Sequence, residues 1–241
     1  MIKVVKFGGS SLASAAQFKK VGAIIRNEET RRYVVPSAPG KRHSGDTKVT
    51  DLLYKCYGQA ILDDDREEDF EEILKVIKDR YDSIINGLEL TISLDDEFKT
   101  IRENFSKKIG RDYAASRGEY LNGIIMAAYL GYEFIDAAEV IFFDEEGEFD
   151  AEKTNEVLSE RLAHTERAVI PGFYGSNPDG TIHTFSRGGS DITGSIVARA
   201  VHADMYENWT DVSGFLIADP RIIKNPKAID VITYRELREL S

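Results

Sequence analysis

The sequence lacks the features that mark several large classes of protein. It has a single cysteine, Cys56, so no internal disulfide can form and a reducing compartment fits. No run of about 18 apolar residues occurs, and the N-terminus has neither the charged region nor the apolar segment of a signal peptide. These absences argue against a secreted disulfide scaffold and a membrane-spanning protein, and they predict a soluble cytoplasmic chain.

Positive charge and metal-ligand patterns are also scarce. The 31 Lys and Arg residues are outnumbered by 42 Asp and Glu residues, and the formal net charge of -11 argues against a general nucleic-acid binder. The four histidines, at positions 43, 164, 183 and 202, show no metal-ligand spacing. A small phosphate site remains compatible with this composition, because it needs only local positive charge and backbone N–H groups.

What the sequence does have is an alternation of strands and helices. Apolar runs predict strands at 3–7 and 33–40, and helical spacing of apolar residues predicts helices at 15–26 and 49–60. This order favours a parallel sheet covered by helices. Cys56 falls on the apolar face of the second helix, which favours core packing over a role as a nucleophile.

Residues 61–112 interrupt the alternation with an acidic, helical stretch. We interpret it as a helical hairpin inserted into, or flanking, the α/β core, with its charges on a solvated face rather than in a metal site. The alternation then resumes. The further elements predicted are helices at 117–130, 152–163 and 190–202, strands at 133–137, 139–143, 167–173, 181–185 and 205–210, and an unfinished helix at the C-terminus.

Two glycine pairs stand out, in "KFGGSS" (6–11) and "FSRGGSD" (185–191). Each follows a predicted strand and precedes a helix, where backbone N–H groups can meet phosphate oxygens. A single pair would be an ordinary turn, but two pairs flanked by charge and hydroxyls favour two walls of one anion site. Neither pair matches the P-loop or the dinucleotide-binding fingerprint.

The charged neighbours of these glycines have alternative roles. Lys6 could extend into solvent or reach phosphate oxygens, and Arg187 offers a planar fork for a carboxylate or phosphate. Asp191 could be a favourable charge at a helix N-terminus, could hold Lys6 in place, or could help to bind Mg²⁺.

Together these segments carry a resemblance. "VVKFGGSSLA", "SAPGKR" followed by "KVTDLL", "SRGEYL", "FSRGGSD" and "WTDVSGFLIADPR" resemble the ordered motifs of aspartate kinases, in the amino-acid-kinase superfamily, from residue 3 to about 222. The resemblance implies an α/β fold: a three-layer αβα sandwich with a mainly parallel central sheet (amino-acid-kinase or carbamate-kinase-like), carrying the helical insertion at about 61–112.

The activity implied is ATP-dependent phosphorylation of the β-carboxylate of L-aspartate to 4-phospho-L-aspartate, the first step toward lysine, threonine, methionine and diaminopimelate. A carboxylate acceptor is already ionised at pH 7, so no general base is needed. ATP and Mg²⁺ are the implied cofactors, with Mg²⁺ held mainly through the ATP phosphates and no protein metal site. The alternatives are a kinase for another small amino-acid carboxylate and an inactive nucleotide- or amino-acid-binding module.

The resemblance also implies roles for particular residues. Lys6 would stabilise the transferring phosphates, and Asp191 would orient Lys6. Glu119 would meet the substrate ammonium and Arg187 a substrate carboxylate; a carboxylate at Glu119 would also be favourable simply as an early helix residue. The remaining implied contacts are Ser37, Thr50 and Ser190 with the substrate, and Gly8, Gly9, Ser10, Gly188, Gly189, Thr210, Asp211 and Arg221 with ATP or its phosphates.

This chain departs from the family pattern in several places. Ser10 replaces the commoner threonine, and Ser213 and Leu216 stand where many relatives have proline and tyrosine. The family's next lysine-containing segment would fall just beyond Ser241, and the regulatory ACT domains are absent. We therefore expect residues 1–241 to be a catalytic domain truncated at its C-terminus. Relatives commonly dimerise, so a homodimer is expected for the full-length enzyme.

Overall fold

The computed structural model describes residues 1–62, 67–186, 188–210 and 222–227. The chain divides into two compact units, Met1–Trp209 and Thr210–Ser241. In the second unit the description covers Thr210 and a short exposed turn at 222–227, where Asn225 has a positive φ of 58°. The predicted C-terminal helix and the departures at Ser213 and Leu216 lie outside the described residues. All further statements concern the first unit.

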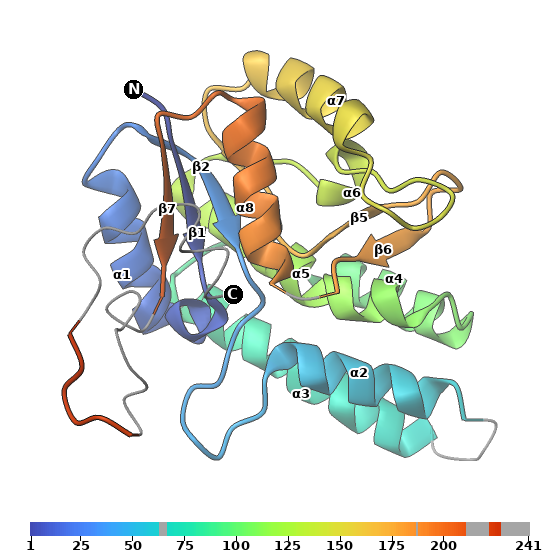
Figure 1. Cartoon of the computed structure of the whole chain (residues 1–241). Helices are drawn as coiled ribbons and strands as arrows, with labels where there is room; N and C mark the ends of the chain where they lie inside the picture. Colours follow the sequence, from blue (N-terminus) through green and yellow to red (C-terminus); the bar gives the residue numbers. More distant parts are fainter. Residues whose placement is uncertain (63–66, 187, 211–221, 228–241) are drawn as a thin grey trace. The chain divides into compact units, whose positions relative to one another are not determined.

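The first unit is built on a parallel sheet of five strands in the order β3-β4-β2-β1-β7 (Figure 1). Each neighbouring pair of these strands is parallel, and the register pairs Lys6 on β1 with Asn208 on β7. Helices cover both faces, which confirms the predicted three-layer α/β fold. The strands are β1 (Lys3–Phe7), β2 (Arg31–Pro36), β3 (Glu133–Phe134), β4 (Ala168–Val169) and β7 (Met205–Trp209).

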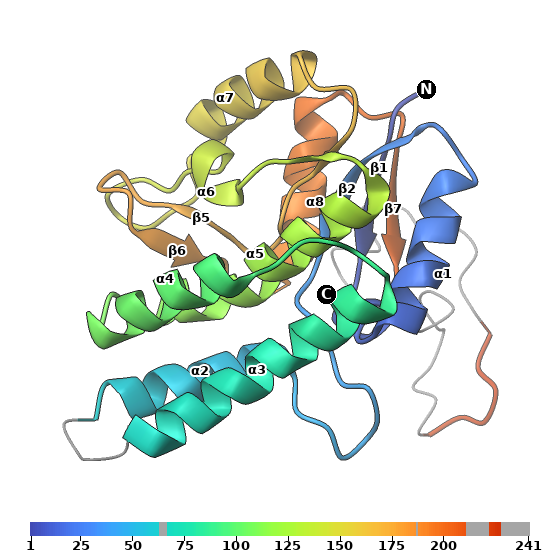
Figure 2. The ribbon, with the colours of Figure 1, turned by 180° about the vertical axis from the view of Figure 1, so that it is seen from behind.

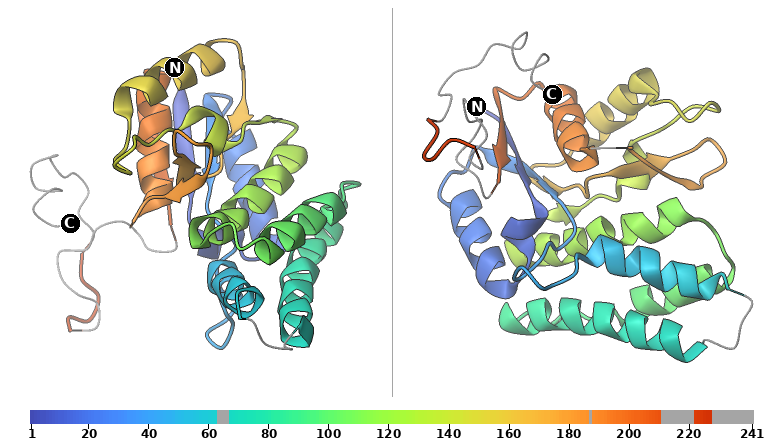
Figure 3. Two further views of the ribbon diagram at one scale, coloured as in Figure 1. Left: turned by 90° about the vertical axis from the view of Figure 1, so that its right-hand side faces the viewer. Right: turned by 60° about the horizontal axis from the view of Figure 1, so that its bottom comes forward.

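The two faces of the sheet bury two separate hydrophobic cores, because successive side chains of a strand point to opposite faces. On β1, Val5 joins one core and Val4 the other, and Val34 and Val35 of β2 divide in the same way. One face is covered by α1 (Ala15–Arg26) and α5 (Arg111–Leu130), and the other by α7 (Ala151–Ala163) and α8 (Gly189–Ala200), as Figure 3 shows.

The predicted helical hairpin consists of α3 (Glu67–Gly87) and α4 (Asp95–Ser106), and it packs with α2 (Val49–Ala60) and α5 (Figure 2). Its buried residues belong to the same core as α1 and one face of the sheet. Cys56 is fully buried there, and burial raises the pKa of its thiol to about 12, so the packing role is confirmed. The hairpin is thus continuous with the α/β core.

Two predicted strands differ from the structure. Residues 139–143 do not form a strand. The first two lie in the helix α6 (Ala137–Val140), which Asp136 Oδ1 caps by accepting a hydrogen bond from Ala138 N, and Phe142 and Phe143 make only isolated β-bridges. The strand predicted at 181–185 exists as β6 (Ile182–Thr184). It pairs antiparallel with β5 (Tyr174–Ser176) in a separate two-stranded sheet rather than in the central one.

In the described part of the chain, no helix combines the length and apolar character needed to cross a membrane. A short 3₁₀ helix, η1 (Gly9–Leu12), follows β1, and together with the loop after β2 it forms the edge of the sheet where the strands end. The predicted site residues that the structure describes in the first unit lie at or beside this edge.

Candidate functional site

Lys6 and Asp191 form an ion pair at the carboxyl end of β1. Lys6 Nζ lies 2.7 Å from Asp191 Oδ1, and the two side chains are 10% and 47% exposed. Lys6 points to the face of the sheet that α8 covers, since it lies two residues beyond Val4 on β1. Asn208 Nδ2 donates a hydrogen bond of 2.9 Å to the same Asp191 oxygen. One carboxylate oxygen therefore receives an ammonium and an amide.

The two glycine pairs flank this ion pair. A methyl group added to Gly8 would lie 3.9 Å from Lys6 Nζ, and one added to Gly188 would lie 3.9 Å from Asp191 Oδ2. The structure thus brings "KFGGSS" and "FSRGGSD" to two sides of one charged pair. We name Lys6, Gly8, Gly188, Asp191 and Asn208 the Asp191 cluster.

The N-terminus of α8 is held in place by backbone geometry. Gly188 precedes the helix with φ of 62°, a left-handed conformation that favours glycine, and no side chain caps the first turn. Thr193 Oγ1 accepts a hydrogen bond from Phe173 N and donates one to Gly189 O. The first turn of a helix leaves backbone N–H groups without helical partners, and no side chain caps them here, which makes this turn a candidate for binding an anion.

Ser190 and Gly172 are in close contact behind this turn. A methyl group on Gly172 would lie 2.6 Å from Ser190 Oγ, and Gly172 N donates to Pro36 O at the end of β2. Ser190 is 9% exposed. The close approach fixes the first turn of α8 against the ends of β2 and β4.

Glu119 lies in a different environment, inside α5. It is 6% exposed, its Oε2 has no hydrogen-bond partner, and burial raises the pKa of its carboxyl to about 8. Backbone hydrogen bonds with Ala38 and with its own N–H, and the charge of Arg117, oppose this rise in pKa. An unpaired buried carboxyl is costly. The arrangement therefore suits a ligand that supplies positive charge and N–H donors.

The loop after β2 connects α5 to the glycine turn after β1. On one side Asn122 Nδ2 donates a 2.7 Å hydrogen bond to Ser37 O, and a methyl group on Gly118 would lie 3.7 Å from Thr50 Oγ1. On the other side Gly40 N donates to Gly9 O at 2.8 Å. Side chains at Gly9 or Gly40 would collide with the facing backbone, at 2.6 Å in each case. We name Ser37, Ala38, Thr50, Glu119 and Asn122 the Glu119 cluster.

Helix α3 supports the loop after β2 and the part of α5 that carries Glu119. The sequence did not reveal this support. The buried Arg80 guanidinium donates to Gly40 O and to Thr47 O, and its Nη1 lies 2.8 Å from Asp46 Oδ2. The adjacent Tyr81 donates its hydroxyl to Gly118 O at 2.7 Å. No motif signals these contacts, because each joins α3 to a residue far away in the chain.

Arg117 is a second feature that the sequence did not reveal. Its guanidinium is buried against the rings of Tyr113, Tyr120 and Tyr174, at 4.6, 4.2 and 5.5 Å from their centroids. Ser116 Oγ accepts its hydrogen bonds. The three rings keep this charge close enough to Glu119 to limit the rise in carboxyl pKa that burial causes.

Not every predicted site residue can be placed. Arg187, Asp211 and Arg221 lie outside the described residues, and Thr210 belongs to the second unit. Ser10 lies in η1, where its backbone N faces Gly40. The structure therefore brings together Lys6, Gly8, Gly188 and Asp191, and it places Ser37, Thr50 and Glu119 around the adjoining loop.

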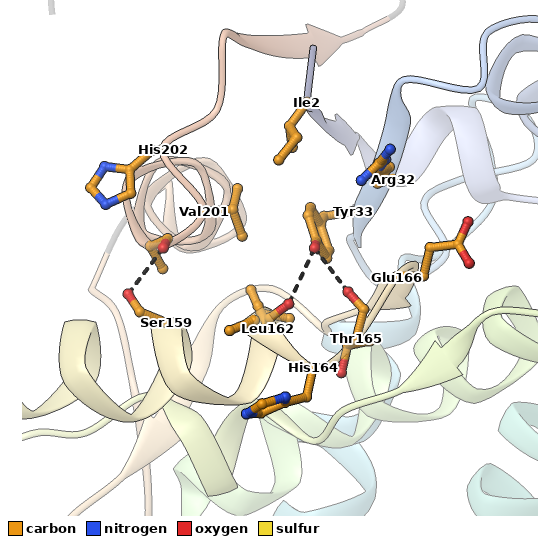
Figure 4. A pocket seen from close by; sticks show the side chains of 12 residues that line it. Ile2, Arg32, Tyr33, Ser159, Leu162, His164, Thr165, Glu166, Val201 and His202 are labelled. Carbon is orange, nitrogen blue, oxygen red and sulfur yellow. Dashed lines mark hydrogen bonds between the residues drawn. The ribbon is translucent and has the colours of Figure 1, made fainter.

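A separate cavity of about 610 Å³ opens at the opposite edge of the sheet, where the strands begin (Figure 4). Ile2, Leu162 and Val201 line it, and the Tyr33 hydroxyl donates to Leu162 O and Thr165 O at its wall. None of the described site residues lines this cavity. Within the described ranges, no group of three or more His, Cys, Asp or Glu side chains could hold a metal ion.

Comparisons with known proteins agree with this fold. Aspartokinase 3 of Bacillus subtilis (strain 168) is 41% identical over 255 residues, covering 100% of this chain and 55% of that protein. The crystal structure of aspartate kinase from Clostridium acetobutylicum has 53% identity and a TM-score of 0.91, covering 99% of this chain and 54% of the other. Aspartokinase III of E. coli, solved with aspartate and ADP, has 25% identity and a TM-score of 0.81, covering 95% of this chain and 54% of the other.

The chain thus spans about half the length of the relatives it matches. A family model described as the amino acid kinase family matches residues 1–241. With the fold, the relatives and this match in agreement, the chain belongs to the amino acid kinase family.

Proposed function

We propose that this chain carries the catalytic site of an aspartate kinase, which transfers the γ-phosphoryl group of ATP to the β-carboxylate of L-aspartate. The observation that supports this most is the Lys6–Asp191 pair between two glycine turns, 2.7 Å from nitrogen to oxygen. The buried, unpaired Glu119 carboxyl beside the connecting loop supplies a place for an ammonium group. Aspartate carries that ammonium together with the acceptor carboxylate.

In this reaction one β-carboxylate oxygen forms a bond to the γ-phosphorus, and the bond to the β–γ bridging oxygen breaks to release ADP. No proton has to be removed, because the acceptor is ionised at neutral pH. Catalysis then depends on position and on neutralising the charge of the phosphoryl oxygens. Lys6 would supply that charge, and the backbone N–H groups beside Gly8, Gly9, Ser10, Gly188 and Gly189 would contact the phosphates.

Asp191 would act as a positioning group in this scheme. Its Oδ1 already pairs with the Lys6 ammonium and accepts a hydrogen bond from Asn208, so we propose that the carboxylate orients the lysine rather than taking a proton. On the substrate side Glu119 would bind the ammonium, and Ser37, Thr50 and Ser190 would contact the rest of the amino acid. Arg187 is proposed for a substrate carboxylate, and Thr210, Asp211 and Arg221 for the nucleotide, on the resemblance alone.

Mg²⁺ would enter with the nucleotide. The described residues offer no cluster of carboxylates for it, so we propose that it is held mainly by the ATP phosphates and neutralises their charge. We further propose that the product feeds lysine, threonine, methionine and diaminopimelate synthesis, and that the full-length enzyme is a homodimer. We also propose that the enzyme works in the cytoplasm, because ATP is available there and the buried Cys56 is expected to stay reduced.

Trapping the acyl phosphate tests the proposal directly. The chain is incubated with ATP, Mg²⁺, hydroxylamine and, separately, L-aspartate, L-glutamate, N-acetylglutamate or succinate. We expect a hydroxamate from L-aspartate only. If only another acid gave a hydroxamate, the proposed substrate would be wrong and that acid would take its place. If no acid gave one, the result would contradict kinase activity of this chain.

A further inference from the structure

The strand β7 contributes a polar side chain to the Asp191 cluster that the glycine motifs do not contain. Asn208 pairs in register with Lys6, and its side chain points to the same face of the sheet as that of Tyr206, two residues earlier. That face is the one α8 covers. Asn208 therefore lies between the end of β1 and the first turn of α8.

The packing of α8 on β7 fixes this geometry. The Tyr206 hydroxyl donates a 3.3 Å hydrogen bond to Asp191 O, and it lies 2.5 Å from where a methyl group on Gly194 would be. Gly194 thus lets β7 approach α8 closely, one turn after Asp191. With the backbone held there, the Asn208 amide reaches Asp191 Oδ1 at 2.9 Å.

The ion pair needs such support at its carboxylate end. The Lys6 side chain is only 10% exposed, but that of Asp191 is 47% exposed, and an ion pair with one partner open to solvent contributes little by itself to holding that side chain in one orientation. A neutral amide that donates to the carboxylate restricts its rotation without competing for the lysine. A glutamate or aspartate at position 208 would compete with Asp191 for the Lys6 ammonium, and a leucine would leave the Asp191 carboxylate free to rotate.

We propose that Asn208 is a positioning residue for phosphoryl transfer: its amide fixes the Asp191 carboxylate so that Lys6 Nζ stays aimed at the transferring phosphate. This inference rests on the proposed function and adds a group from β7 to it. Asn208 would contact neither the amino acid nor the reacting atoms, and would act only through Asp191.

The test combines single variants with a double-mutant cycle, measured by hydroxamate formation at saturating ATP. We expect N208L to lower kcat about 10-fold, as for loss of a hydrogen bond to a charged group, with the KM for aspartate nearly unchanged. N208D keeps the shape but replaces the donor with a second carboxylate, so its loss should exceed that of N208L. M205A, at the far end of β7 where Met205 is 48% exposed, is the matched control and should keep the wild-type kcat.

The cycle separates positioning from simple packing. In a D191A background N208L should have no further effect on kcat, because its route of action has been removed. Equal losses in both backgrounds, a wild-type kcat for N208L, or N208D behaving like wild type would each overturn the inference. If wild-type protein forms no hydroxamate with any acid, the proposed function fails instead.

A crystal structure of N208L tests the positioning role without activity. We expect the Asp191 carboxylate to rotate and the distance from Lys6 Nζ to Asp191 Oδ1 to exceed about 4 Å, the limit for an ion pair. An ion pair unchanged from that of the wild-type protein would overturn the inference.

Discussion

The Asp191 cluster and the Glu119 cluster each contain one carboxylate, but in opposite surroundings. Asp191 is about half exposed, forms an ion pair with Lys6 and accepts a hydrogen bond from Asn208. Glu119 is buried in α5, with one oxygen unpaired and its carboxyl pKa raised to about 8. The first carboxylate already has its partners within the protein, whereas one oxygen of the second has no hydrogen-bond partner among the described residues. We therefore propose that the same functional group positions a side chain in one place and binds a ligand in the other.

Replacing Lys6 should produce the largest effect, since it removes the charge that the Asp191 cluster holds in place. We expect Lys6→Met to lower kcat about 10²- to 10³-fold, a loss comparable to removing one preorganised donor from a transition state. Methionine preserves the buried stem of this 8%-exposed residue, so thermal unfolding should change little. A large fall in melting temperature with kcat intact would show that the lysine is structural.

Replacing Glu119 should affect binding rather than turnover. We expect Glu119→Gln to raise the KM for aspartate about 10- to 100-fold, as for loss of a charge-assisted hydrogen bond, with a smaller change in kcat. Steady-state kinetics of hydroxamate formation provides the measurement. If Glu119→Gln changed kcat and left the KM unchanged, the proposed difference between a binding role for the Glu119 cluster and a positioning role for the Asp191 cluster would not hold.

The contact between Gly9 and Gly40 links the two clusters, so a side chain there should disturb both. We expect Gly9→Ala to lower the free energy of unfolding by about 1–3 kcal/mol, because its methyl group would lie 2.6 Å from Ala38 O. Gly58→Ala in α2 is the matched control. It meets nothing within 4 Å and should stabilise the protein by about 0.5–1 kcal/mol in denaturant unfolding. Equal effects of the two changes would show that the loops are not in close contact.

The pH dependence of stability should reveal Glu119 in the ligand-free protein. Its carboxyl pKa is about 8 in the folded chain against an ordinary value of 4.5, so between these values the folded state binds the extra proton. Stability should therefore fall as pH rises through this window, by up to about 1.4 kcal/mol per pH unit.

Glu119→Gln should abolish this fall and leave the ligand-free protein more stable than wild type, increasingly so toward pH 8. Urea unfolding at several pH values measures it, with Gly58→Ala expected to parallel the wild type. If Glu119→Gln left the pH profile of stability unchanged, the pKa of the Glu119 carboxyl would not be raised by burial as expected.

Local patterns predicted most of the secondary structure and failed where distant contacts intervened. The helix predicted at 15–26 is α1 (Ala15–Arg26), because its apolar spacing and the Ser14 cap are both local. The strand expected at 139–143 does not form, since α6, which Asp136 caps, runs to Val140 and the residues after it make only isolated bridges. The strand before "FSRGGSD" was correctly predicted, but its placement in a separate sheet depends on pairing with β5.

The site shows the same division. The glycine pairs left a contact between Asp191 and Lys6 as one of three alternatives, the resemblance implied it, and the structure places the two side chains 2.7 Å apart. Asn208, Arg80 and Tyr81 escaped sequence reasoning, because each acts on a residue or backbone carbonyl far away in the chain. Nothing in the local sequence distinguishes such a side chain from an ordinary polar or core residue.

By itself the sequence determined the residue types that favour a phosphate site and the alternation of strands and helices, because side-chain chemistry and periodicity are local properties. Only the tertiary structure decided which carboxylate is paired and which is buried without a full set of partners. That outcome depends on how α5, α8, β7 and the loop after β2 meet at one edge of the sheet. Burial and charge partners, rather than residue type, then set what each carboxylate can do.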